Sequence, residues 1–171
     1  EMFANMLANV GKEYGDCMIV VENNTIGWSV LTKLEECRYP NIYYARKSTH
    51  EYVDPLIGET SSNSIGGFMM SKNTRPLVVA KLEEFIRNKL ITIYSTRLFN
   101  EMKTFVWNHG KAQAMKGFND DLVMACAIGC WVKDAVYVTG RAENDYKKAF
   151  LGAMTRSDTK MNTTIPGMIG H

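Results

Sequence analysis

The sequence lacks the features that mark several specialised classes of protein. Its four cysteines form no CxxC pair, so neither a zinc site nor a disulfide framework is indicated, and reduced thiols fit a cytosolic protein. No apolar run reaches the roughly 18 residues of a membrane span, and no signal-peptide pattern is present. The formal net charge is only +2, so any contact with nucleic acid has to come from a local patch.

What is present is the composition of a soluble globular domain. The chain has 171 residues, of which 46% are apolar and 22% are charged. We predict one domain over residues 1–140, followed by a short helix and an exposed tail over residues 141–171. The first residues, EMFANMLANVGKEYG, resemble the middle of a fold, so we expect that sequence upstream of Glu1 is absent.

Helices and strands alternate along the predicted domain. Apolar residues at helical spacing predict helices, while β-branched and aromatic runs predict strands. The predicted helices cover residues 3–10, 25–37, 77–89, 95–107 and 120–134, and the predicted strands cover 17–22, 42–46, 65–70 and 90–94. The 17–22 strand reads as buried on both faces. The alternation predicts an α/β layer architecture around a partly parallel sheet.

Three carboxylates stand where predicted elements end or begin. Glu22 ends the 17–22 strand, while Asp120 and Asp121 open an apolar helix. In open α/β sheets, binding sites gather beyond the carboxyl ends of strands and at the adjacent helix starts. Clustered carboxylates repel one another unless a hard cation lies between them, which would be Mg²⁺ or Mn²⁺. The alternative is that an aspartate caps the helix and Glu22 faces solvent.

Four basic residues are candidate contacts for DNA phosphates. Lys72 and Arg75 lie in a polar turn before the 77–89 helix, and Lys111 and Lys116 lie in a predicted turn before the two aspartates. Basic groups beside a metal site can hold a nucleic-acid backbone without reading its sequence. The alternative is an ordinary solvated surface. Trp107 is predicted to pack in the core rather than to stack on bases.

Two stretches resemble one family. VVENNTIGWSVLTKL and GFNDDLVMACAIGCW resemble the glutamate and double-aspartate motifs of the nuclease domain in large terminase subunits of tailed phages, especially the T-even type. The order of the elements between them is also similar, and the resemblance covers residues 1–135. It implies an RNase H-like mixed sheet flanked by helices, here lacking the first strands of the usual fold, and catalysis by two metal ions.

The resemblance also implies roles for individual residues. Glu22 matches the middle acidic residue of the family, and either Asp120 or Asp121 matches the last. Asn23 and Asn24 follow the glutamate as supporting residues, and Asn119 stands where relatives often have His. The family's first catalytic aspartate lies on a strand upstream of this chain, and no Walker A pattern occurs. We therefore expect weak or absent cutting by this chain alone, and a homo-oligomer that covers the surface left by the missing strands.

The resemblance implies a metal-dependent endonuclease that cuts concatemeric double-stranded DNA during viral genome packaging. The full-length parent would work with an ATPase domain, the portal and the small terminase subunit. It would act in the host cytoplasm, away from any membrane, and would not remain in the mature virion. The alternatives are another RNase H-like nuclease, of the resolvase or transposase type, and a non-catalytic module that binds DNA or the portal.

Overall fold

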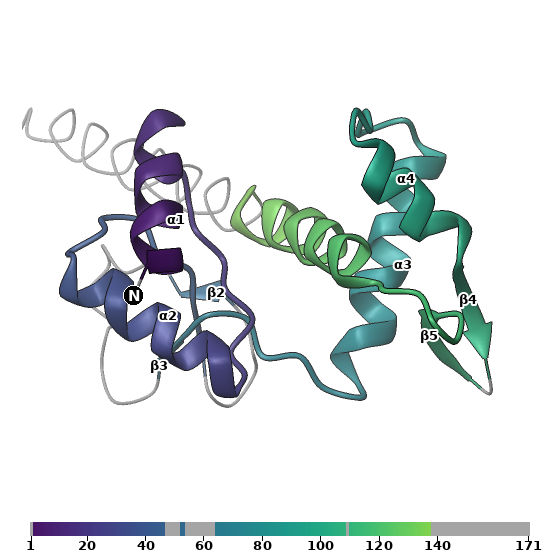
Figure 1. Cartoon of the computed structure of the whole chain (residues 1–171), viewed down its shortest axis with the longest axis horizontal. Coiled ribbons are helices and arrows are strands. Elements are labelled where there is room, and N and C mark those ends of the chain that lie inside the picture. The colour runs from purple at the N-terminus through teal and green to yellow at the C-terminus, as the bar shows by residue number, and fades with distance from the viewer. Residues whose placement is uncertain (1, 47–51, 54–63, 109, 138–171) are drawn as a thin grey trace, which may run out of the picture. The chain divides into compact units, whose positions relative to one another are not determined.

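The computed structural model describes residues 2–46, 52–53, 64–108 and 110–137. The chain forms two compact units, Glu1–Ala135 and Val136–His171, and nearly all of the second lies outside the described residues. The first unit mixes helices with two small antiparallel sheets, which confirms the predicted mixed α/β class (Figure 1). None of the helices in the described part of the chain is both long and apolar enough to cross a membrane.

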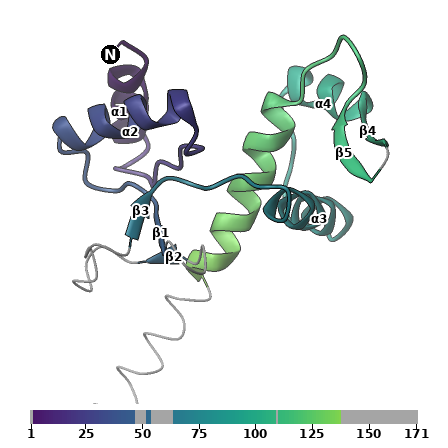
Figure 2. The same cartoon turned by 90° about the horizontal axis from the view of Figure 1, so that it is seen from below.

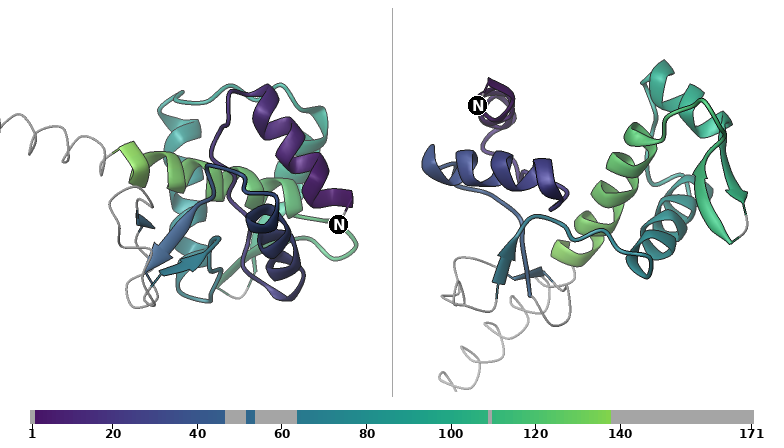
Figure 3. Two further views of the ribbon diagram at one scale, coloured as in Figure 1. Left: turned by 90° about the vertical axis from the view of Figure 1, so that its left-hand side faces the viewer. Right: turned by 60° about the horizontal axis from the view of Figure 1, so that its bottom comes forward.

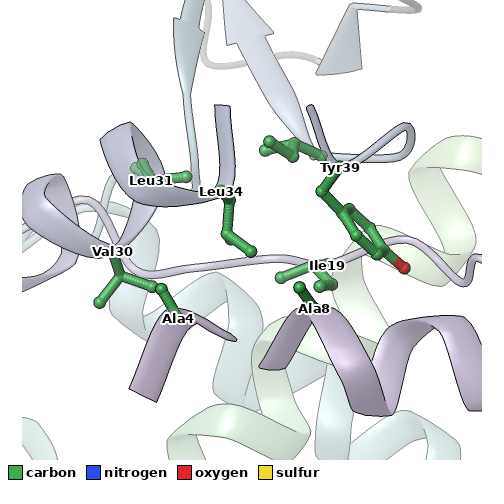
Figure 4. Close-up of a cluster of buried hydrophobic side chains, with 8 residues drawn as sticks. Ala4, Ala8, Ile19, Val30, Leu31, Leu34 and Tyr39 are labelled. Carbon is green, nitrogen blue, oxygen red and sulfur yellow. The ribbon is translucent and has the colours of Figure 1, made fainter. Parts of the chain in front are cut away.

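The first core of this unit lies between two helices and an extended segment. α1 (Met2–Glu13) and α2 (Thr25–Glu36) lie side by side in Figures 1 and 2. Figure 4 shows Ala8 of α1 and Leu34 of α2 beside Ile19, and Val30 facing Ala4. The buried cluster is Ala4, Ala8, Ile19, Val30, Leu31, Leu34, Tyr39 and Ile42. Burying a leucine of this kind stabilises the fold by roughly 1.5–3 kcal/mol.

The helix predicted over residues 3–10 is confirmed as part of α1. Its apolar spacing also predicts one inward face made of Phe3, Met6, Leu7 and Val10, but of these only Leu7 packs against the core. Phe3, Met6 and Val10 are exposed, and the residues that face the core are small, including Ala4 and Ala8. The close approach of α1 explains this difference. A Cβ atom on Gly11 would lie 2.2 Å from the Tyr39 hydroxyl, so small residues are needed where α1 contacts the core.

The predicted 17–22 strand is an extended segment that pairs along one edge. It makes isolated parallel bridges from Ile19 to Ile42 and from Glu22 to Phe68. Ile19 is buried toward the helices. Met18 and Val20 are only partly buried and make no backbone hydrogen bond within the described residues. The prediction that this segment is buried on both faces is therefore wrong, because one of its faces lines a cavity.

A three-stranded sheet follows this segment. β1 (Tyr44–Arg46) lies between β2 (Tyr52–Val53) and β3 (Ser64–Gly66), and both pairings are antiparallel. Figure 3 shows β1 and β3 next to each other. β1 falls within the predicted run at 42–46 and β3 overlaps the one at 65–70, whereas β2 lies outside both predicted runs. The predicted parallel pairing is limited to the bridges of the 17–22 segment.

The third helix begins at a turn, as predicted. α3 (Thr74–Arg87) has Pro76 in its first turn, where a missing backbone N–H costs little. Its buried residues are Val78, Val79, Leu82 and Phe85. The apolar spacing of the 77–89 segment also predicts inward positions for Leu77 and Ile86, but both are exposed. The predicted strand at 90–94 is wrong, because these residues form no regular element.

A hairpin replaces the end of the predicted fourth helix. α4 (Thr96–Lys103) starts at Ser95, whose hydroxyl accepts the Leu98 N–H, as the sequence predicts for a cap. The chain then forms β4 (Phe105–Asn108) and β5 (Lys111–Ala114). β-branched and aromatic residues favour this strand. Trp107 is 61% exposed, so the prediction that it packs in the core is wrong.

The last described helix covers residues 121–137 and packs on α3 (Figure 1). Lys133 lies over the Phe85 ring at 5.2 Å, and Lys81 pairs with Asp134 at 2.9 Å. This helix confirms the predicted apolar helix near 120–134. The short helix and tail predicted for residues 141–171 lie outside the described residues.

Candidate metal centre and adjoining basic hollow

Glu22 is positioned by its backbone neighbours. Gly27, in the first turn of α2, lies so close that a Cβ atom there would be 1.9 Å from the Glu22 carbonyl oxygen. Gly67 has a φ of +81°, and a Cβ atom there would lie 2.6 Å from the Val21 carbonyl oxygen. Glycine is therefore required at both positions, and together they fix the path of the chain through Glu22.

The two asparagines after Glu22 are structural. Asn24 caps α2, because its side-chain oxygen accepts the Gly27 N–H at 2.9 Å. The side-chain amide of Asn23 donates to the Gly66 carbonyl at 2.8 Å. Through these two hydrogen bonds, Asn24 attaches the segment carrying Glu22 to α2 and Asn23 attaches it to β3.

Asp120 is neutralised by an ion pair. Its Oδ2 accepts from the Arg75 guanidinium at 2.5 Å and from the Ala114 backbone N–H at 3.3 Å. Arg75 also donates through Nε to the Ala112 carbonyl at 2.9 Å. Arg75 therefore joins α3, β5 and the start of the 121–137 helix. The sequence predicted that Arg75 contacts DNA. In the structure its guanidinium forms an ion pair with Asp120.

Glu101 caps the helix that carries Asp121, which the sequence did not reveal. Its Oε2 accepts the N–H groups of Leu122 and Val123, at 2.8 and 3.4 Å. A cap from an aspartate was the alternative that the sequence left open, and Glu101 takes that place instead. Because a residue of α4 provides the cap and Arg75 holds Asp120, the exposed Asp121 carboxylate has no partner among the described residues.

The three predicted acidic residues line one cavity, here called the acidic hollow, with a volume of about 520 Å³. The extended segment contributes Met18, Val20 and Glu22, and Arg75 and Asp120 lie at its wall. The 121–137 helix contributes the rest of the lining, which is Asp121, Met124, Ala125, Ile128 and Gly129. The structure thus brings Glu22 to the same cavity as both aspartates.

The carboxylates of this cavity fit a hard cation only in part. Glu22 and Asp121 have no hydrogen-bond or ion-pair partner among the described residues, and carboxylate oxygens are suitable ligands for Mg²⁺ or Mn²⁺. Asp120 is occupied by Arg75. In the described part of the chain, no group of three or more His, Cys, Asp or Glu side chains is close enough to hold a metal ion. Glu22 and Asp121 are therefore the two residues of this cavity whose carboxylates are available to an ion.

A second cavity adjoins the first and shares Arg75. This basic hollow, of about 590 Å³, is lined by Lys72 and Lys111 as well as Arg75. Three of the four predicted DNA contacts are therefore brought together. Lys116 lines a different cavity, beside Phe118, and Asn119 is exposed.

No family model matches the chain. The resemblance described above therefore depends on its two sequence motifs alone. Both motifs contribute to the acidic hollow, through Glu22 from the first and the two aspartates from the second.

Gly27 and Glu101 help to position the acidic residues but were not predicted from the sequence. They differ in whether the sequence carries any signal of that role. Gly27 stands inside an apolar helical pattern, where glycine is unfavourable, and this indicates a close backbone approach. Glu101 carries no such signal. A polar residue on a surface helix looks the same whether it faces solvent or caps the next helix, so only the tertiary arrangement identifies it.

Proposed function

We propose that this chain is the metal-dependent endonuclease domain of a phage DNA-packaging terminase, with an RNase H-like fold, and that it cuts concatemeric double-stranded DNA. The observation that carries the proposal is the acidic hollow. Glu22 and Asp121 are far apart in the sequence, yet both line one cavity without a partner among the described residues. The extended 17–22 segment, with helices on one face and the cavity on the other, is compatible with that fold.

The side chains have separate tasks in this proposal. Glu22 and Asp121 would hold Mg²⁺ or Mn²⁺, and Asp120 would hold Arg75 at the wall of the cavity. An ion held by Glu22 and Asp121 would supply an activated water and would stabilise the leaving oxygen in phosphodiester cleavage. Since only two carboxylates are free, we expect weak or absent cutting by this chain alone.

The partners follow from the same proposal. The substrate is double-stranded DNA, and the full-length parent works with an ATPase domain, the portal and the small subunit in the host cytoplasm. We also propose that the chain self-associates. The exposed apolar side chains of α1, among them Met2, Phe3 and Met6, support this, because a contiguous apolar patch favours association.

The test is a Mn²⁺ titration of the wild-type chain and of Glu22→Gln and Asp121→Asn. Each variant removes the negative charge of one proposed ligand while keeping the size and shape of the side chain. We expect each to lose more affinity than the roughly 10–100-fold that is typical for partners outside the ligand shell. Glu13→Gln, on the exposed end of α1, is the matched control and should bind like the wild type.

Plasmid nicking in Mg²⁺ or Mn²⁺ completes the test. We expect little cutting by the wild-type chain, and strong Glu22-dependent cutting would contradict that part of the proposal. Equal Mn²⁺ binding by the wild type and by Glu22→Gln would refute the metal site.

A non-catalytic DNA-binding module is the second candidate. It is favoured by the basic hollow and by the ion pair that withdraws Asp120 from metal binding. Salt-sensitive binding of duplex DNA, combined with no binding of Mn²⁺, would favour this candidate over the nuclease.

A further inference from the structure

The basic hollow has the chemistry of a site for a phosphate group. Lys72 and Lys111 come from a turn and from β5, and neither has an acidic partner among the described residues. Arg75 is the third cation of its lining. The remaining walls include Met70, Pro76 and Ala112, which are apolar. A cationic lining with apolar walls suits a sugar–phosphate backbone and repels a free divalent cation.

The charge in this hollow comes from side chains rather than from the start of α3. The Ser71 hydroxyl already accepts the backbone N–H groups of Asn73 and Thr74, at 3.3 and 3.0 Å. The Arg75 N–H donates to the Ser71 carbonyl at 3.0 Å, and Pro76 has no N–H. The helix start therefore has few free donors for an anion, and recognition falls to Lys72, Lys111 and Arg75.

Arg75 connects the basic hollow to the acidic hollow. Arg75 lines both cavities, and its guanidinium donates to Asp120 and to the Ala112 carbonyl. A guanidinium has five N–H donors, so it can also contact a phosphate oxygen. An anion in the basic hollow competes with Asp120 for this cation. Weakening the Arg75–Asp120 pair returns negative charge to the acidic hollow, where a metal ion would bind.

From this geometry we propose that the basic hollow is a subsite for one phosphate of a DNA backbone, and that Arg75 couples its occupancy to cation binding in the acidic hollow. The inference that the basic hollow binds a phosphate group depends only on the residues that line it. The inferences that this phosphate belongs to DNA and that its binding is coupled to a metal ion rest on the proposed function. Coupling of this kind is reciprocal, so the cation must also strengthen DNA binding by the same factor.

The first experiment measures binding of a short labelled DNA duplex in EDTA, by fluorescence anisotropy at several salt concentrations. It compares the wild type with the double variant Lys72→Ala/Lys111→Ala. The control, Lys12→Ala/Arg97→Ala, removes the same charge from exposed positions on α1 and α4, outside the hollow. We expect the hollow variant to lose at least about tenfold in affinity and about 1 in the log–log salt slope, as for one phosphate contact.

The control variant should keep the wild-type slope, and thermal melting should show all variants folded, because the substituted side chains are exposed. Equal duplex affinity and slope for the two double variants would overturn the subsite. Inorganic phosphate is the second probe. Lys72- and Lys111-dependent binding of phosphate, with no binding of the duplex, would overturn DNA as its source.

The second experiment measures Mn²⁺ affinity with and without the duplex. We expect the duplex to tighten Mn²⁺ binding at least about fivefold in the wild type, the low end of typical couplings, and to have no such effect in the hollow variant. The same enhancement in both would overturn the coupling. Absence of Mn²⁺ binding in every sample would refute the metal site and the coupling, while the EDTA measurement still decides the phosphate subsite.

Discussion

Glu22 and the two aspartates reach the acidic hollow with different kinds of support. Glu22 depends on close backbone contacts, in which Gly27 and Gly67 leave no room for a side chain. Asp120 and Asp121 depend on charged side chains, because Arg75 holds the first and Glu101 caps the helix that begins with the second.

This difference has a consequence for solution conditions. Packing of the backbone against glycine does not change with salt or moderate pH. The Arg75–Asp120 pair has side chains that are 20% and 24% exposed, so salt screens it at least in part. The acidic hollow therefore combines a wall that is insensitive to ionic strength with one that responds to it.

The largest effect is expected when the space beside the Glu22 backbone is filled, because this tests the support that depends on glycine. Gly27→Ala puts a Cβ atom 1.9 Å from the Glu22 carbonyl oxygen, which is backbone and can only move with the chain. We expect the free energy of unfolding to fall by about 1–3 kcal/mol or more, as for overpacked cores. Urea denaturation measures this effect.

Gly129→Ala is the matched control for Gly27→Ala. Gly129 also lines the acidic hollow, but it lies in the 121–137 helix and a Cβ atom there meets nothing within 4 Å. Alanine should raise the free energy of unfolding by roughly 0.5–1 kcal/mol, through its better helix propensity. Similar losses in both variants would show that the packing around Glu22 is not special.

A smaller effect is expected on the side-chain support of Asp121. Glu101→Ala removes the cap from the N–H groups of Leu122 and Val123, and should lower the free energy of unfolding by about 1 kcal/mol. Glu101→Gln keeps a side-chain oxygen that can accept these bonds, so it should lose less. If Ala and Gln are equally stable, the contact does not act as a cap.

The smallest expected effect is a difference in thiol reactivity, and measuring it does not change the stability of the fold. It compares Cys17 and Cys37, near the segment that carries Glu22, with Cys126 and Cys130 in the 121–137 helix. Cys17 and Cys37 are exposed, whereas burial raises the pKa of Cys126 and raises that of Cys130 to about 11. Since the thiolate is the reactive form, a raised pKa lowers reactivity at pH 8. Labelling of the native chain with a thiol reagent should show two fast and two slow groups, and all four should become fast in denaturant.

Four fast thiols in the native chain would contradict the burial of the 121–137 helix. Mass spectrometry of the labelled peptides assigns the fast and slow groups to individual cysteines. This measurement sharpens the comparison, because the helix that carries the aspartates is also the one whose cysteines are shielded.

The sequence predicted the elements best where local chemistry decides them. Ser95 caps α4 and Asn24 caps α2, and both are recognisable from a polar residue before an apolar helical pattern. The 121–137 helix follows from its apolar run. For the site, the positions of Glu22 and Asp121 at the junctions of elements were enough to predict that they share a cavity.

The remaining features depend on contacts between distant parts of the chain. The apolar spacing of α1 indicates the face with Phe3 and Met6, but close packing at Tyr39 selects the face with small residues. The helical spacing at 95–107 predicts a helix where the β4 strand of the hairpin lies. This strand becomes favourable only when β5 pairs with it, so the local sequence does not indicate it. The Arg75–Asp120 pair joins residues 45 positions apart, so no local pattern contains it.

The position of Glu101 has a consequence for motion. α4 is eight residues long and has no buried residue, so little free energy opposes its local opening. When α4 opens, the N–H groups of Leu122 and Val123 lose their acceptor, and the first turn of the next helix frays together with Asp121. Amide hydrogen exchange at these two positions should follow the opening of α4. One wall of the acidic hollow therefore fluctuates at a rate set by a helix outside the cavity.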